Sequence, residues 1–106
     1  MDMHAIDLSP SALPRCFVID EARRVVMECS ARPGEPRDAH YFAPDENATR
    51  LPALLDRAIE VLELNCIADQ TSSRSAIFGH LTVKVQLIAG ASATHTAVTI
   101  GLARAA

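Results

Sequence analysis

The chain carries three cysteines, Cys16, Cys29 and Cys66, whose thiols could take part in redox chemistry or bind a metal. Their number is odd, no C-x-x-C pair occurs, and no cysteine lies close in the sequence to a histidine. A zinc site needs three or four ligands that converge. We therefore predict reduced, partly buried thiols that act as small apolar side chains, and no bound metal.

Nucleophilic catalysis is the second chemistry that the residue types allow. His40 could serve as a base, with Cys66 or Ser72 as the nucleophile and Asp38 nearby. Such groups must lie within hydrogen-bond distance of each other and of a third, orienting group. The sequence contains no nucleophile-elbow or cysteine-protease motif, so we predict no catalytic residues and a protein that is not an enzyme.

Two apolar runs near the start of the chain predict a β-hairpin. In CFVIDEARRVVMEC the runs 17–19 and 25–27 flank a charged centre, which places strands near residues 16–20 and 24–29. The loop length favours a turn of four or five residues built around a type I turn. Because both runs lack polar alternation, we expect strands that are covered on both faces.

Two later segments alternate between apolar and polar residues, as half-buried strands do. In residues 80–87 the apolar side chains fall on odd positions, and in residues 96–102 they are Val98, Ile100 and Leu102. Residues 89–93 predict the turn between these strands, and residues 75–78 fit a further short strand.

One segment, residues 51–64, predicts an amphipathic helix. Its apolar residues recur at helical spacing, and acids and an arginine occupy the other face. The expected inward residues are Leu51, Leu54, Leu55, Ala58, Ile59 and Leu62. Residues 30–48 hold three prolines and predict a loop. The order of elements predicts an α+β domain, an antiparallel sheet of about five strands with one main helix on one face.

The length and charge of the chain indicate a single domain and argue against a membrane protein or a nucleic-acid-binding protein. The chain has 106 residues, which fits a single domain over residues 15–104 preceded by a flanking segment, residues 1–14. No apolar run approaches the roughly 20 residues that span a membrane, and the start lacks the features of a signal peptide. The net charge is −3 and the basic residues are scattered. We expect a cytoplasmic protein that contacts neither membrane nor nucleic acid directly.

Four stretches in the predicted strands resemble a PAS domain. They are the entry Ala12–Asp20, the return strand at residues 23–26, and the closing strands at residues 83–88 and 97–100. The chain is most similar to the reduced PAS-like sensor domains that precede helix-turn-helix segments in LuxR-type bacterial regulators. The resemblance implies a central first strand that pairs with the last one, residues 17–20 against residues 97–101. It also implies a domain for sensing or interaction in transcription regulation.

The resemblance raises the question of a cofactor. Asn65-Cys66 is similar to the dipeptide that carries the flavin adduct in light-sensing PAS domains, but here it follows a helix and continues as Ile67-Ala68. A haem-binding PAS domain has its axial histidine on the helix before the final strands, and residues 51–64 contain no histidine. We expect no cofactor and a colourless protein.

The resemblance also implies a place for a ligand and a place for a second subunit. A small-molecule ligand, if one binds, would lie between helix and sheet; the alternative is that the same side chains only fill the core. The candidate lining consists of Phe17, Ile19, Met27, Leu55, Ile59, Leu62, Val83, Val85, Val98 and Ile100. On the opposite face of the sheet we expect a homodimer contact built from Val18, Thr82, Lys84, Ala97 and Thr99.

An alternative of a different class is a small α+β enzyme of the cone-shaped isomerase kind. Such an enzyme needs buried acid–base groups. Asp20 and Glu28 are the acids that lie beside apolar strand residues. An enclosed polar cavity would favour this alternative.

Overall fold

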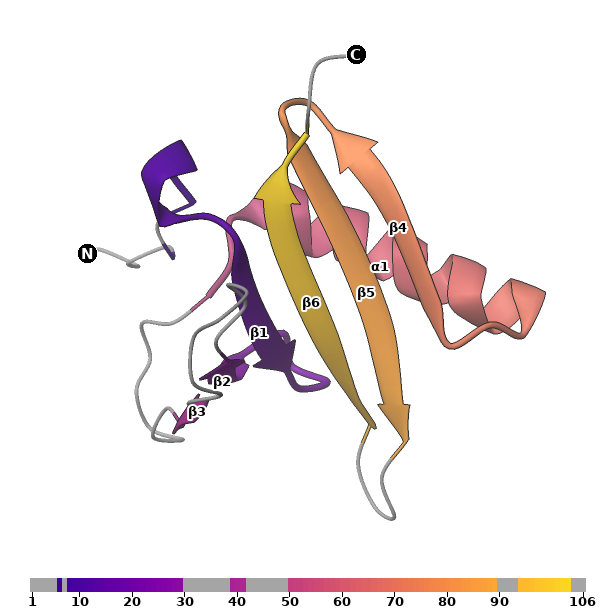
Figure 1. Cartoon of the computed structure of the whole chain (residues 1–106). Helices are drawn as coiled ribbons and strands as arrows, with labels where there is room; N and C mark the ends of the chain where they lie inside the picture. Colours follow the sequence, from indigo (N-terminus) through magenta and orange to yellow (C-terminus); the bar gives the residue numbers. More distant parts are fainter. Residues whose placement is uncertain (1–5, 7, 30–38, 42–49, 90–93, 104–106) are drawn as a thin grey trace.

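The computed structural model describes residues 6, 8–29, 39–41, 50–89 and 94–103. Within them, six antiparallel strands form one sheet in the order β3-β2-β1-β6-β5-β4, and helix α1 (Ala53–Asp69) lies on one face of it (Figure 1). The strands are β1 (Arg15–Ile19), β2 (Val25–Cys29), β3 (Ala39–Tyr41), β4 (Ser73–Phe78), β5 (Leu81–Ala89) and β6 (Thr94–Leu102), and a 3-10 turn, η1 (Pro10–Ala12), precedes β1. The predicted α+β class, with one main helix on one face of an antiparallel sheet, is confirmed.

The first strand lies in the middle of the sheet, between β2 and the last strand, β6. Arg15 stands opposite Ile100 and Ile19 opposite Thr96, so the predicted pairing of first and last strands is confirmed. Because β1 and β6 are neighbours, the centre of the sheet is built from the first and the last strand in the sequence.

The β1–β2 hairpin contains an irregularity that the sequence pattern does not reveal. Val18 stands opposite Met27, whereas Ile19 stands opposite Val25, so β2 has one extra residue at this point. Val25 and Met27 therefore point to opposite faces, although a regular strand would put them on the same one. The prediction that Met27 faces the helix is wrong: it shares the outer face with Val18 and is half-buried.

A tight turn closes this hairpin. The Arg23 amide donates to the Asp20 carbonyl at 3.0 Å, and the Asp20 amide donates to the Arg24 carbonyl at 3.0 Å. Asp20 Oδ1 also accepts the amides of Ala22 and Arg24, at 2.9 and 3.0 Å. Arg23 has a φ of 65°, a left-handed conformation that favours glycine. The turn is therefore held by the Asp20 carboxylate.

Helix α1 packs one stripe of side chains on the sheet: Leu55, Ala58, Ile59, Leu62 and Cys66. It runs to Asp69, beyond the predicted end near residue 64, and ends at Gln70 in a left-handed conformation whose amide donates to carbonyls of the last turn. The prediction that Leu54 faces inward is wrong, because this side chain is 86% exposed. No helix in the described part of the chain is long and apolar enough to cross a membrane.

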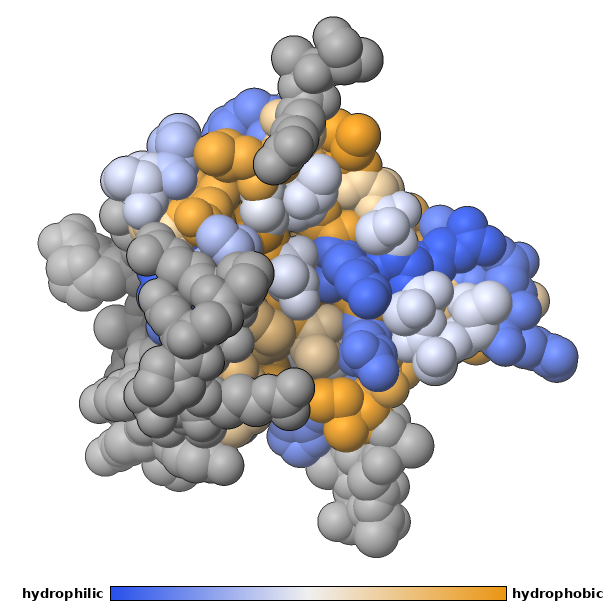
Figure 2. All heavy atoms as spheres, viewed as in Figure 1, coloured by the Kyte–Doolittle hydropathy of each residue, from blue (hydrophilic) through white to orange (hydrophobic). Residues whose placement is uncertain are grey.

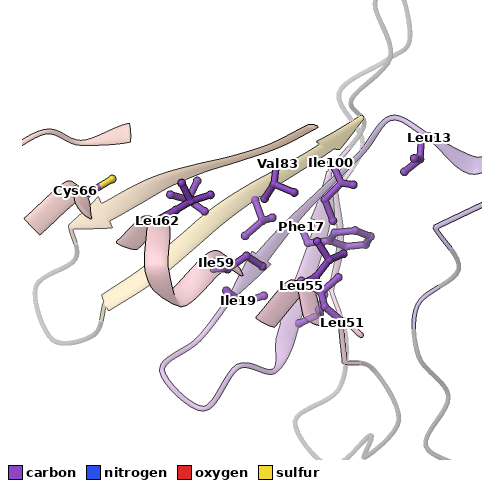
Figure 3. Close-up of a cluster of buried hydrophobic side chains, with 13 residues drawn as sticks. Leu13, Phe17, Ile19, Leu51, Leu55, Ile59, Leu62, Cys66, Val83 and Ile100 are labelled. Carbon is purple, nitrogen blue, oxygen red and sulfur yellow. The ribbon is translucent and has the colours of Figure 1, made fainter. Parts of the chain in front are cut away.

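The side chains between helix and sheet form one packed core (Figure 3). The fully buried side chains include Phe17 and Ile19 from β1, Ile59 from α1, Val83 and Val85 from β5, and Val98 and Ile100 from β6. Figure 3 shows Phe17, Leu55, Ile59 and Ile100 converging between the two layers, with Leu62 and Cys66 farther along the helix. Burial of this set supplies the main driving force for folding.

The predicted loop over residues 30–48 contains the short strand β3, in which Tyr41 stands opposite Met27. The prolines and charges of this segment argue against a long strand, but three residues suffice to extend the edge of the sheet. The other residues of that loop lie outside the described residues. Of the turn predicted over residues 89–93, Ala89 is the last residue of β5, and residues 90–93 lie outside the described residues.

Candidate ligand groove

The predicted lining of a pocket between helix and sheet fills the core instead. Nine of the ten candidates belong to the buried cluster and are at most 5% exposed: Phe17, Ile19, Leu55, Ile59, Leu62, Val83, Val85, Val98 and Ile100. Met27, the tenth, lies on the other face of the sheet. A ligand would have to displace these packed side chains to bind among them.

A groove of about 720 Å³ lies beside this core instead, at the C-terminal half of α1. The helix forms one wall, the adjoining ends of β5 and β6 form the second, and the β1–β2 turn forms the third. Its lining comprises Glu21, Arg23, Glu60, Glu63, Leu64, Ile67, Gln70, Thr71, Ser72, Leu87, Ile88, His95 and Thr96. The size is within the range of small-molecule sites.

Glu63 joins the three walls of the groove. Its Oε1 lies 2.7 Å from Arg23 Nη1 in the β1–β2 turn. Its Oε2 accepts a hydrogen bond from the hydroxyl of Thr96 on β6. The Glu63 side chain is 17% exposed and Thr96 is 5% exposed, so both bonds are largely shielded from water. Together these contacts tie the turn to the helix and to the last strand.

A second carboxylate, Asp56, lies seven residues before Glu63 on α1. Its Oδ1 is buried and has no hydrogen-bond partner among the residues that the structure describes. Burial raises the pKa of Asp56, against the opposing effect of the positive charges of Arg23 and Arg50. Arg50 itself donates to the carbonyl of Ala22, at 3.3 Å. The β1–β2 turn therefore lies close to the flank of α1 that carries Asp56 and Glu63.

The chemistry of the groove suits a ligand with an apolar body and a polar or cationic group. Leu64, Ile67 and Leu87 supply the apolar surface. Three glutamates line the groove beside a single arginine, and that arginine is paired with one of the glutamates. Three acidic side chains against one arginine give the lining of the groove an excess of negative charge.

Of the residues considered for catalysis, the structure describes the side chains of Cys66 and Ser72. Cys66 is fully buried in the core, whereas Ser72 is exposed at the groove. Asp38 lies outside the described residues, and His40 is described only by its backbone in β3, opposite Glu28. The part of the chain that the structure describes holds no group of three or more side chains able to bind a metal ion.

The enzyme alternative requires the acids Asp20 and Glu28, and each of them is paired with an arginine. Arg15 donates to both oxygens of Glu28, from Nε at 2.8 Å and from Nη2 at 2.7 Å. Arg24 Nε donates to Asp20 Oδ2 at 3.0 Å. Each carboxylate thus has a structural role in the β1–β2 hairpin, and neither residue belongs to the lining of the groove.

The predicted dimer residues lie on the face of the sheet opposite the helix. Across the strands, Val18 stands opposite Ala97, and Thr99 stands opposite Lys84. Lys84 is exposed, and Thr82, Ala97 and Thr99 are half-buried. Val18 is only 8% exposed within one chain, so it offers little area to a partner. Figure 2 shows this face, with hydrophobic surface near the ends of β5 and β6 and hydrophilic surface toward β4.

Comparisons with protein-family models, with characterised proteins and with solved structures find no match for the chain. The site therefore has to be understood from its own geometry. Its central residues, Arg23, Glu63 and Thr96, were not predicted from the sequence, because a charged residue on the polar flank of a helix usually faces water. The spacing of Asp56 and Glu63, two turns apart on one flank, is the sequence signal that could have indicated them.

Proposed function

We propose that this chain is a cytoplasmic, PAS-like sensor or interaction domain of a LuxR-type bacterial transcription regulator. The strand order carries the proposal: the first strand is central and pairs with the last, as the PAS resemblance implies. The groove, which contacts the helix, the β1–β2 turn and the ends of β5 and β6, offers a place for a small ligand. The proposed output is a change in homodimer packing on the outer face of the sheet.

The mechanism we propose is a shift in population between two arrangements of the hairpin. A ligand in the groove would contact Arg23 and Glu63, the ion pair that joins the β1–β2 turn to α1. Because β1 lies in the middle of the sheet, a shift of its turn reaches the strand that carries Val18 and its neighbours on β6. Only a ligand that prefers one arrangement can shift the equilibrium.

The regulatory part of the proposal can be tested with a reporter. The chain is fused to a helix-turn-helix domain that lacks a dimerisation element of its own, and repression is measured at a palindromic operator. The wild-type fusion should repress, and Ala97→Glu, which places a charge in the outer face, should abolish repression. Ala68→Glu is the matched control, since Ala68 is exposed on the helix. No repression by the wild-type fusion at normal expression would contradict the proposal.

The ligand part can be tested by a thermal-shift screen with small amphiphilic compounds that carry an amine. A ligand of the groove should raise the melting temperature of the wild-type chain, because it binds the folded state. Ile67→Asp, in the apolar wall, should remove the shift. Leu54→Asp should preserve it, because Leu54 is equally a solvent-exposed helix residue but lies outside the lining. Equal loss in both variants would argue against binding in the groove.

A further inference from the structure

Two of the three cysteines lie directly opposite each other on neighbouring strands. Cys16 of β1 and Cys29 of β2 are partners in the antiparallel register, so their side chains point to the same, outer face of the sheet. Both are free thiols of intermediate exposure. They are 13 positions apart in the sequence, at the two outer ends of the predicted hairpin.

The register brings the pair into the range of a disulfide. Directly opposed residues in an antiparallel pair have Cα atoms roughly 4.5 or 5.5 Å apart, and disulfides span about 4.4–6.8 Å between Cα atoms. Their Cβ atoms point the same way, as a disulfide requires. Desolvation raises the pKa of Cys29, and the neighbouring Cys16 raises it further, which agrees with two sulfurs in close proximity. The Thr99 hydroxyl donates to Cys16 Sγ at 3.6 Å, on the side of Cys16 away from β2.

We propose that Cys16 and Cys29 form a reversible cross-strand dithiol–disulfide site that is oxidised by low-molecular-weight disulfides. One protein thiolate attacks the oxidant, forms a mixed disulfide and releases one small thiol. The second protein thiolate then attacks the protein-side sulfur of that mixed disulfide and releases the second small thiol. Two protein S–H bonds are replaced by one S–S bond, and the two electrons and two protons end on the two small thiols.

A disulfide between Cys16 and Cys29 would constrain the β1–β2 hairpin. The bond would link the ends of β1 and β2 farthest from their turn, and that turn carries Glu21 and Arg23 in the wall of the groove. A closed hairpin has fewer ways to move its turn away from Glu63. Oxidation of the two cysteines would thus restrict the motion of the β1–β2 turn at the groove. The formation of the bond does not depend on the proposed function or on dimerisation.

The full chain is incubated with mixtures of oxidised and reduced glutathione, quenched with acid, and digested with trypsin without reduction. Trypsin does not cleave the Arg32–Pro33 bond, so cleavage after Arg15, Arg23, Arg24 and Arg37 should yield residues 16–23 linked to residues 25–37. Dithiothreitol should separate the two peptides. Cys66→Ser should behave like the wild-type chain, whereas Cys16→Ser and Cys29→Ser should give no internal disulfide. The oxidised chain should melt roughly 5–15 °C above the reduced one.

Four results would overturn the proposal. One is a native chain that keeps all thiols reduced in excess oxidised glutathione, while the urea-unfolded chain forms the bond. Another is a disulfide that involves Cys66 in the folded protein. The third is a product limited to mixed or intermolecular disulfides. If a dimer covers the outer face, the monomeric variant Ala97→Glu should form the same bond faster, and failure of that variant to form it would equally overturn the assignment.

Discussion

At the scale of single residues, Asp20 and Asp56 show how different environments shift the pKa of the same kind of side chain in opposite directions. Asp20 is bound by backbone amides and by Arg24, whereas Asp56 has a buried oxygen that no described residue hydrogen-bonds. The first carboxylate therefore stabilises the folded state as an anion, and the second is an anion in a place that favours the neutral acid.

Replacing Asp56 by Asn should raise the free energy of unfolding at pH 7 by about 0.5 kcal/mol, a value kept small because solvent screens a group that is only partly buried. Burial raises the pKa of Asp56 in the folded state above the ordinary 3.8, so the wild-type chain loses stability as pH rises from that value through the folded pKa. Asp56→Asn should lack this decline. Urea unfolding at pH 4 and pH 7 measures it, with the exposed Glu60→Gln as the control. A variant that is less stable at pH 7 would contradict this account.

Replacing Asp20 by Ala should lower the free energy of unfolding by about 1–2 kcal/mol, because the turn amides lose their acceptor. Burial alone would raise the pKa of Asp20, but hydrogen bonds from Arg24 and Ala22 and the charge of Arg24 together lower it below 3.8. The ionised Asp20 carboxylate therefore contributes its full stabilisation above pH 3.8, the ordinary pKa of the unfolded chain. This stabilisation is lost as the pH falls below 3.8 and through the lower pKa that Asp20 has in the folded chain. Asp20→Asn keeps an acceptor and should cost less. Equal losses for Asn and Ala would show that the acceptor does not matter.

At the scale of elements, the β1–β2 turn carries both the unusual backbone and the ion pair of the groove. Arg23 combines a φ of 65° with the contact to Glu63. A non-glycine residue in this conformation costs roughly 1 kcal/mol relative to glycine. The sequence places arginine there nevertheless, which fits a role for its side chain at the groove.

Two substitutions at Arg23 separate these effects. Arg23→Gly and Arg23→Ala both remove the ion pair, but only glycine relieves the backbone. Arg23→Gly should therefore be more stable than Arg23→Ala by about 1 kcal/mol in urea unfolding. Matching stabilities for the two variants would mean that the turn changes its conformation once the side chain is lost.

Several elements could be predicted from the sequence because a local pattern specifies them. The alternation of residues 80–87 and 96–102 predicts half-buried strands, and Val83, Val85, Val98 and Ile100 are indeed fully buried. The helix was predicted for the same kind of reason. Leu54 was misplaced because an apolar residue in the first turn of a helix fits the apolar stripe by spacing even where the sheet does not reach it.

Other features depend on contacts between distant segments and leave no local signal. The extra residue in β2 reverses the face of Met27, although the sequence there is a plain apolar run. The contacts of Glu63 join residues that are distant in the sequence: Arg23 lies 40 positions before it and Thr96 lies 33 positions after it. The register of Cys16 and Cys29 likewise follows from the turn geometry rather than from cysteine spacing.

At the scale of the whole molecule, the sheet is covered by α1 on one face, and the outer face carries the predicted dimer residues. Thr82, Ala97 and Thr99 are half-buried there and only mildly polar, and Lys84 is the exposed charge among them. A stable two-fold contact would have to bury roughly 1,000 Å² or more. The proposed regulator depends on this contact, since a LuxR-type output domain acts on paired half-sites.

Light scattering of the purified wild-type chain at micromolar concentration tests this claim most directly. The wild-type protein should have a mass twice that of the 11.4 kDa chain, and the mass should fall to that of a single chain in Ala97→Glu but not in Ala68→Glu. Circular dichroism should show that both variants keep the fold. A wild-type mass of 11.4 kDa at that concentration would contradict the proposed dimer and, with it, regulation through subunit packing.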